Sequence, residues 1–206
     1  MRFELVGWPE EGPKLSLDYR AFSYAGKFVV TNTGKAVALA DPDEPDAAFS
    51  FPADDERPPP RTDVEGVVDP DGIVLGAVAF TADRTDPDVW WLRYVTVRED
   101  RRGEGIGPRL VGFTTGRLRD RGAREVRIAV NNPYAYEALY RAGFAFTGEE
   151  TGIAELVLSH PAADRPRATY QDGLDLFRAR DPDGDQRAFL DRKAGTDPPD
   201  PVDAPD

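Results

Sequence analysis

The chain has 206 residues, 40% of them hydrophobic, and a formal net charge of −12 at pH 7, which predicts one globular domain with its own core. The absence of cysteine excludes disulfides, thiolate metal sites and cysteine nucleophiles, and a single histidine, His160, excludes a histidine cluster. An excess of acidic side chains repels nucleic acid and anionic lipid, so neither is expected as a partner. We expect no metal, and a surface position for His160 at a strand end.

The first forty residues predict short elements. Residues 2–6 alternate weakly and indicate an edge strand. Asp18 is a typical N-cap and predicts a short helix that ends near Ala25. Two apolar runs, 28–30 and 36–39, flank an Asn-Thr-Gly sequence and predict a hairpin. The opening residues lack a signal-peptide pattern and the chain has no long apolar run, so we expect a soluble, cytoplasmic protein without a membrane segment.

The next stretch predicts a loop and then a meander. Residues 41–63 are rich in proline and acidic side chains and predict a long irregular loop, which is either disordered or a lid over a site. Residues 64–68 and 73–81, separated by Asp-Pro-Asp-Gly, predict a hairpin. The β-branched and aromatic run 90–97 predicts the next strand.

A glycine-rich loop follows the 90–97 strand. Gly103, Gly105 and Gly107 precede a helix whose first turn contains Pro108 and whose stop is Gly122. Glycines let the backbone approach a ligand, and the free N–H groups of a helix N-terminus bind phosphate oxygens. The spacing excludes two common phosphate loops, because no G-x-x-x-x-G-K-[ST] sequence exists and the third glycine of a dinucleotide fingerprint is missing.

The chain then alternates between strands and helices. Val126, Ile128 and Val130 predict a strand that runs parallel to 90–97, because a crossover helix joins the two. Pro133 opens a further helix that ends at Gly143. Residues 144–147 and 153–158 predict a last hairpin. Beyond residue 161, short amphipathic helices are predicted around four apolar residues, which are Leu174, Phe177, Phe189 and Leu190. From about residue 196, proline and aspartate predict a disordered acidic tail. The glycine in Asp181–Asp185 is misplaced for an EF-hand loop, so we interpret this run as a solvated turn.

Two motifs resemble the GNAT superfamily of N-acetyltransferases. Residues 102–107, Arg-Gly-Glu-Gly-Ile-Gly, are similar to the family's R/Q-x-x-G-x-G/A loop, and residues 132–135, Asn-Pro-Tyr-Ala, are similar to its N-x-x-A motif, with Gly143 and Phe144 at the end of the helix. The resemblance covers about 64–158. It implies an α/β (α+β) fold with a mixed, mostly antiparallel sheet, a central parallel β-α-β pair and flanking helices.

The resemblance also implies a domain organisation and an activity. We expect an acetyltransferase domain over 1–160 and a C-terminal extension over 161–206. The activity would be transfer of an acetyl group from acetyl-CoA to a small-molecule or peptide amine by direct attack, without a metal, in a monomer or homodimer. A backbone N–H near Val97 would polarise the thioester carbonyl. The residues expected to bind acetyl-CoA are Val95, Val97, Arg102, Gly103, Glu104, Gly105, Ile106, Gly107 and Asn132. Three neighbouring arginines would either steer the anionic donor or only offset nearby acids, and these are Arg98, Arg101 and Arg109.

The proton-transfer residues are less well specified. The position of the family's acid tyrosine falls on Leu139, which cannot donate a proton. Tyr140 would replace it if the helix is offset, and Tyr136, one turn earlier on the same face, if the helix is regular. The candidate bases are carboxylates, which are Glu65, Glu155 and Asp88.

Two other functions stay open from the sequence. A non-catalytic acyl-CoA sensor would keep the glycine loop and lose the acid, in which case water would stand in the tyrosine's place. A partner-binding protein would use its acidic, proline-rich segments and keep the core as a scaffold. Acetyl-CoA binding separates the partner-binding protein from the acetyltransferase and the sensor. Thiol release with amines separates the acetyltransferase from the sensor.

The charge balance predicts that stability depends on the salt concentration. The chain has 25 Asp and 13 Glu but 22 Arg and only 4 Lys, a composition similar to that of proteins from halophilic organisms. At −12, carboxylates repel one another, and molar salt screens this repulsion beyond roughly 3 Å. The melting temperature should therefore rise between low and molar potassium chloride. A melting temperature that stays flat or falls would contradict the halophilic interpretation.

Overall fold

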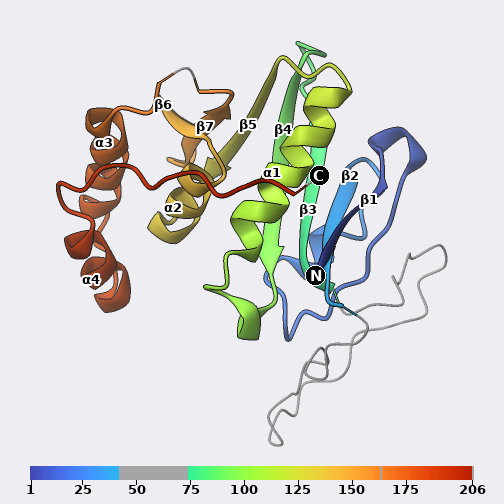
Figure 1. Ribbon diagram of the computed structural model, residues 1–206, viewed down its shortest axis with the longest axis horizontal. Helices are drawn as coiled ribbons and strands as arrows, with labels where there is room; N and C mark the ends of the chain where they lie inside the picture. The colour runs from blue at the N-terminus through green and yellow to red at the C-terminus, as the bar shows by residue number, and fades with distance from the viewer. Residues whose placement is uncertain (42–73, 163, 206) are drawn as a thin grey trace, which may run out of the picture.

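A computed structural model describes residues 1–41, 74–162 and 164–205 as one seven-stranded sheet with helices (Figure 1). The strands stand in the order β1-β2-β3-β4-β5-β7-β6. The strands are β1 Arg2–Gly7, β2 Gly34–Leu39, β3 Val74–Ala82, β4 Val89–Val97, β5 Glu125–Val130, β6 Ala145–Glu150 and β7 Leu156–His160. The helices are α1 Ile106–Asp120, α2 Pro133–Arg141, α3 Arg167–Arg178 and α4 Gly184–Arg192. Short 3-10 turns lie at Pro9–Glu11, Ala25–Lys27 and Glu99–Arg101.

The predicted fold class is confirmed. Among the described strands, β4 and β5 form the one parallel pair and every other neighbouring pair is antiparallel. Helix α1 makes the crossover between them, as a parallel connection requires. The edge strand at the N-terminus and the last hairpin, β6–β7, are also confirmed. None of the described helices is both long and apolar enough to cross a membrane.

The two faces of the sheet are buried by different segments. On the helix face, Ala36, Val78 and Phe80 belong to a core that includes Leu110 of α1. On the opposite face, the alternate residues of β2 and β3 form a second cluster with apolar side chains of the segment 13–30, among which Phe28 is fully buried. Side chains alternate across a strand, so each central strand supplies both cores. This division matters for the site, because it fixes which residues reach each face.

Two expectations for the N-terminal third are wrong. Asp18 does begin a turn, since its carbonyl accepts hydrogen bonds from the Ala21 and Phe22 N–H groups at 3.0 and 2.9 Å, but no α-helix follows. Residues 28–30 do not form a strand, because both edges of β2 are already paired with β1 and β3. In both places, burial of apolar side chains against the sheet outweighs the preference of the local sequence for a helix or a strand.

Other predicted features lie outside the described residues. The loop predicted at 41–63 falls there except for Asp41, and so do the strand predicted at 64–68 and Glu65. The hairpin that was expected to include 73–81 is therefore described only through β3, which pairs with β2 and β4.

The C-terminal extension continues the main core. Tyr170, Leu174, Phe177 and Leu190, on α3 and α4, are buried in the same cluster as α1 and α2. Figure 1 shows the following segment, in red, crossing from these helices toward α1. The domain boundary at residue 160 stays a prediction.

The tail, for which the composition predicts disorder, contacts neighbouring elements in the structure. It has no regular structure, but the Val202 N–H donates to the Arg141 carbonyl at 2.7 Å. The Pro199 carbonyl accepts from the Arg165 guanidinium at 2.9 Å. Ala204 lies beside Gly112 of α1, where an added Cβ would come within 3.1 Å of the Ala204 Cβ. Hydrogen bonds to the Arg141 carbonyl and from the Arg165 side chain thus connect the tail to neighbouring elements without regular structure.

His160 ends β7 as expected, but it is only partly exposed. Its ring packs against Phe144 with 5.4 Å between centroids. Burial lowers the pKa of His160, and no described group hydrogen-bonds its buried Nδ1. The predicted position at a strand end is therefore confirmed, but the side chain is only partly at the surface, because Phe144 and the turn that follows α2 pack against it.

The burial of Lys35 makes the free energy of unfolding depend on pH. Lys35 is fully buried in β2, where its Nζ donates to the Val30 and Thr33 carbonyls at 2.7 and 2.9 Å, and burial lowers its pKa to about 8. Between this value and the ordinary pKa of 10.5, the unfolded chain binds a proton that the folded chain has lost, so this group's contribution to the free energy of unfolding rises with pH.

Comparing the parent protein with Lys35→Met isolates that contribution. We expect the difference in unfolding free energy between the two proteins to shift in favour of the parent from pH 8 to pH 10, by up to about 1.4 kcal/mol per pH unit. Denaturant unfolding at each pH measures it. A difference that does not change with pH would show that Lys35 titrates normally.

Candidate functional site

The parallel strands β4 and β5 pair along only part of their length. The paired residues run from Val89 to Leu92 on β4 and from Glu125 to Ile128 on β5. At this point β4 has a bulge: its neighbour β3 pairs Phe80 with Leu92 and Ala79 with Tyr94, which leaves Arg93 extra. Beyond the bulge, residues 94–97 stay paired with β3 but have no partner strand on the β5 side among the described residues. The sheet is therefore open between the ends of β4 and β5.

A cavity of about 210 Å³ occupies this opening. Val111 of α1 and Leu139 of α2 line it from the helix face. Tyr24 and Tyr94, whose neighbours belong to the opposite core, line it as well, together with Arg93. Glu155, in the turn before β7, and Asn131, after β5, complete the polar part of the wall. The cavity thus reaches both faces of the sheet.

A larger groove of about 670 Å³ runs along the glycine loop on the helix face. Its walls are the loop, the first turn of α1 and the exposed side of α2. It shares part of its wall with the cavity in the sheet, including Val95, Gly107 and Asn132. The predicted donor-binding residues that line the groove are Val95, Val97, Arg102, Gly103, Gly105, Ile106, Gly107 and Asn132. The Asn132 side chain also caps α2 by accepting the Ala135 N–H at 2.8 Å.

The glycine loop has the geometry of an anion site. Gly103 and Gly105 have φ values of +88° and +79°, which residues with a Cβ rarely adopt. An added Cβ at either residue would meet nothing within 4 Å. Among the described residues, no carbonyl accepts a turn or cap hydrogen bond from the N–H groups of 103–107. These groups and the positive end of the α1 dipole are therefore available to phosphate oxygens.

The arginines near the loop divide into two groups. Arg98 is buried and pairs with Asp100 at 2.7 Å, and Arg101 pairs with Glu104 at 2.9 Å. These two offset neighbouring acids, as one interpretation of the sequence expected. Arg102 instead donates to the Ser23 hydroxyl at 3.0 Å. Arg109 packs over Phe3, away from the groove, and Arg141 of α2 joins Arg102 in the groove wall.

Neither predicted acid tyrosine lines the cavity or the groove. Helix α2 is regular, and Leu139 faces the cavity. Tyr136 and Tyr140 are fully buried on the other side of α2, against Tyr170 of α3. The Tyr136 hydroxyl donates to the Tyr170 carbonyl at 3.2 Å, and the Tyr140 hydroxyl accepts the Phe146 N–H at 3.1 Å. Burial raises the pKa of both phenols, which makes them poor proton donors.

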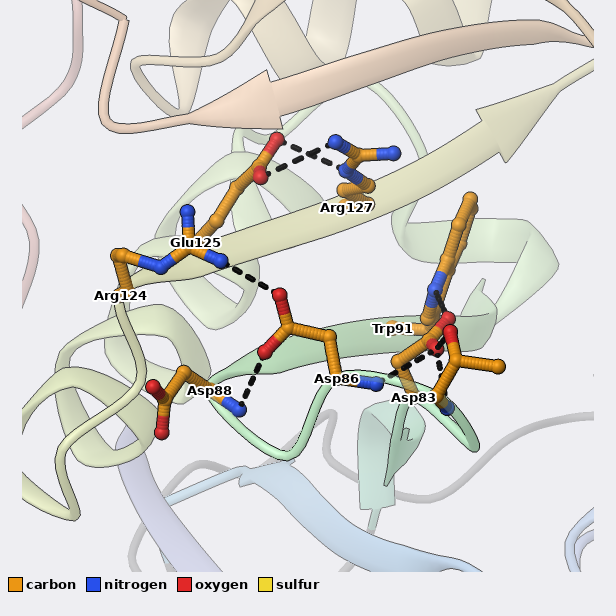
Figure 2. A network of polar contacts seen from close by, with 8 residues as sticks. Asp83, Asp86, Asp88, Trp91, Arg124, Glu125 and Arg127 are labelled. Atoms are coloured by element: carbon orange, nitrogen blue, oxygen red, sulfur yellow. Dashed lines mark hydrogen bonds and ion pairs between the residues drawn. The ribbon is translucent and has the colours of Figure 1, made fainter.

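The candidate bases are far apart in the fold. Glu155 lines the cavity in the opening of the sheet and is half-buried. Asp88 lies at the opposite end of β4, where its N–H donates to Asp86 at 3.1 Å within a polar cluster around Arg124 (Figure 2). Of these two, only Glu155 stands where a substrate amine could reach it.

The sequence analysis missed several residues of the walls. Tyr24 lines both the cavity and the groove, but its segment gave no usable signal. Its backbone is left-handed, with φ of 61°, a conformation that is uncommon outside glycine and clusters at functional sites. Arg93 and Tyr94 stand next to Val95, but only the bulge, which cannot be read from the sequence, turns both toward the opening.

The opening between two parallel strands and the glycine loop beside it suit an extended ligand with an anionic end. The family follows from the sequence model of the Acetyltransferase (GNAT) family, which matches residues 35–144, more than half of the chain. The chain belongs to this family of acetyltransferases, whose members use acetyl-CoA. No metal-binding group of three or more side chains occurs in the described part of the chain.

Several solved acetyltransferase structures are similar to part of the chain. A nourseothricin acetyltransferase is 18% identical, with a TM-score of 0.44 over 77% of this chain and 96% of that chain. An IAA acetyltransferase from Bacillus cereus is 18% identical, with a TM-score of 0.45 over 77% and 97%. The PaiA N-acetyltransferase from Thermoplasma acidophilum, solved with coenzyme A, is 17% identical, with a TM-score of 0.36 over 42% and 52%. No curated protein matches the sequence.

The glycine loop can be tested with a matched pair of variants. Gly105→Val places a side chain where phosphate must approach, and we expect acetyl-CoA affinity to fall by about tenfold or more, since one charge-assisted hydrogen bond is worth ~1.5–3 kcal/mol. Gly122→Val is the control: it imposes similar strain, with φ of +99°, at the other end of α1. Calorimetry on folded protein measures the affinity. If Gly105→Val binds as tightly as the control, the loop does not hold the donor.

Proposed function

We propose that the protein transfers the acetyl group of acetyl-CoA to the amine of a small molecule by direct attack. One observation carries this proposal: the opening between β4 and β5 joins a groove on the helix face to a cavity that reaches the opposite face. A donor in the groove and an acceptor entering from the other face would meet there. Such a meeting would hold two reactants in one orientation, which is a large part of the catalytic effect.

The groove supports binding of the donor at two points. The free N–H groups of 103–107 suit the pyrophosphate, and Arg102 and Arg141 add positive charge in a protein that is otherwise acidic. Neither arginine forms an ion pair within the described residues. Residues 93–97 have an open edge on the β5 side, along which the pantetheine arm can lie as an added strand would. We assign the donor to Val95, Val97, the loop and Asn132.

The chemistry needs a base near the acceptor. The amine nitrogen attacks the thioester carbonyl carbon and forms the new C–N bond, the C–S bond breaks, and the thiolate leaves with the electron pair. The proton lost by the amine goes to Glu155 in this proposal, because Glu155 is the one candidate base of the described chain that lines the cavity. The wall of the cavity is mostly apolar, so water solvates the amine and the Glu155 carboxylate poorly there. This favours transfer of the proton from the amine to Glu155.

The thiolate needs a proton as it leaves. Leu139 occupies the family's usual position for the donor and cannot serve. Tyr24 is the tyrosine that lines both the groove and the cavity, so we assign the donor role to its hydroxyl. A non-catalytic acyl-CoA sensor remains the second candidate function, favoured by this same Leu139. Acetyl-CoA binding without thiol release for any amine would identify a sensor.

The function is tested by thiol release. The protein is mixed with acetyl-CoA and a panel of primary amines, free thiol is measured, and calorimetry follows donor binding without an acceptor. We expect donor binding and thiol release that depends on the amine. If acetyl-CoA does not bind, the proposal fails and the acidic segments become the place to look for a function.

Glu155→Gln should lower kcat by about 10²–10⁴-fold at neutral pH, the range typical of a lost acid–base group, with acetyl-CoA affinity unchanged. Glu149→Gln is the matched control, because Glu149 is an exposed carboxylate on the neighbouring strand β6 and lines neither the cavity nor the groove. Steady-state kinetics with saturating acetyl-CoA measure the effect. Equal rates for the two variants would remove Glu155 from the mechanism.

The tyrosines are separated by three phenylalanine variants. Tyr136→Phe and Tyr140→Phe should each change kcat by less than about threefold while lowering stability, because each removes a buried hydrogen bond worth about 1 kcal/mol. Tyr24→Phe should lower kcat by much more. Kinetics and thermal melting are measured on the same samples. A loss of 10²-fold in Tyr136→Phe or Tyr140→Phe, with the fold intact, would restore that tyrosine as the acid.

A further inference from the structure

We propose that the acceptor is a small amine that also carries a carboxylate, with its amine at Glu155 and its carboxylate at Arg93. This inference rests on the proposed function and names the substrate class of the same cavity. The cavity wall carries one side chain of each charge, and the space beside them fits a small molecule.

Arg93 is placed at the cavity by the β-bulge in β4, as the extra residue opposite β3. Its guanidinium lies over the Trp91 ring, 5.4 Å from the ring centroid. Many arginines of this acidic chain pair with a carboxylate within 4 Å, but Arg93 forms no such pair within the described ranges. The charge of Asp83 acts on Arg93 from a distance, but the Asp83 carboxylate accepts its hydrogen bonds from the Thr85 hydroxyl at 2.7 Å and the Trp91 Nε1–H at 2.8 Å.

Glu155 supplies the opposite charge. Its backbone is fixed by the β6–β7 turn, where its N–H donates to the Thr151 hydroxyl at 3.1 Å and its carbonyl accepts the Thr151 N–H at 2.9 Å. Its carboxylate forms no ion pair with any described side chain, Arg93 included. Two opposite charges therefore line one small cavity without neutralising each other, which leaves both available to a ligand.

A zwitterionic amine complements this arrangement. A carboxylate binds a guanidinium with two parallel hydrogen bonds, which fixes its orientation as well as its affinity. The Tyr24 and Tyr94 rings, 6.1 Å apart between centroids, offer an apolar wall for the carbon chain between the two ends. A diamine of the same length would bring its second ammonium to Arg93, where like charges repel. The volume of about 210 Å³ limits the acceptor to a small molecule.

The first test compares matched acceptors. Linear amino acids with one to five methylene groups and several α-amino acids are assayed by thiol release, each beside its carboxamide and, for the linear series, the diamine of equal length. We expect at least one amino acid to have a kcat/KM about tenfold or more above that of its carboxamide and diamine. If carboxamides, diamines or other primary amines react as well as the acids or better, the inference is wrong and the proposed function still stands. The absence of thiol release with every amine, while donor binding is intact, would overturn both.

The second test changes the arginine. Arg93→Gln should raise KM for the preferred amino acid by about tenfold or more, with KM for its carboxamide unchanged. Arg84→Gln is the control, an exposed arginine of the same β3–β4 hairpin that does not line the cavity. Thermal melting confirms that both variants are folded. An Arg93→Gln protein that treats acid and carboxamide as the parent does would overturn the assignment.

Discussion

The short pairing of β4 with β5 is the constraint on which the site depends. Four residues of each strand pair, and the strands then separate at the bulge that contains Arg93. If the pairing continued to Val97, the backbone edge of β4 would be satisfied by β5, and nothing would connect the two faces of the sheet. The unpaired edge, the cavity and the groove all follow from this single interruption.

The strand pair has a closed end, where 89–92 of β4 pair with 125–128 of β5, and this end must be stable for the other end to stay open. Figure 2 shows its polar contacts: the Asp86–Arg124 ion pair at 2.6 Å and the Glu125–Arg127 pair at 2.8 Å. The first pair is largely exposed and contributes at most about 1 kcal/mol. The apolar side chains of the paired residues contribute more, since Leu92 and Val126 alone, both buried, are each worth roughly 1.5–3 kcal/mol. The open end thus depends on packing at the closed end, with the ion pairs as a minor addition.

The C-terminal extension fixes the helix that walls the site. Glu137 of α2 accepts hydrogen bonds from the Tyr170 hydroxyl of α3 and from Lys193 after α4. Gly173 lets α3 come close enough to contact the Tyr136 hydroxyl, because a Cβ there would overlap it. The face of α2 that the tyrosines occupy is consequently sealed, and the opposite face, with Ala135 and Leu139, is left to the cavity. An extension outside the match to the family thereby decides which α2 residues are accessible.

The sequence by itself determined the elements of the central region: the strand–loop–helix unit at 90–122, the parallel strand after it and the glycines of the loop. These are local patterns. The spacing of apolar residues indicates a strand or a helix, and a backbone position with positive φ favours glycine. Only the tertiary structure decided the wall of the cavity. The bulge at Arg93, the left-handed Tyr24 and the burial of Tyr136 and Tyr140 all depend on contacts between segments distant in sequence. Such contacts override the preference of the local sequence through burial, and for that reason the predicted helix at Asp18 and the hairpin at 28–39 differ from the structure.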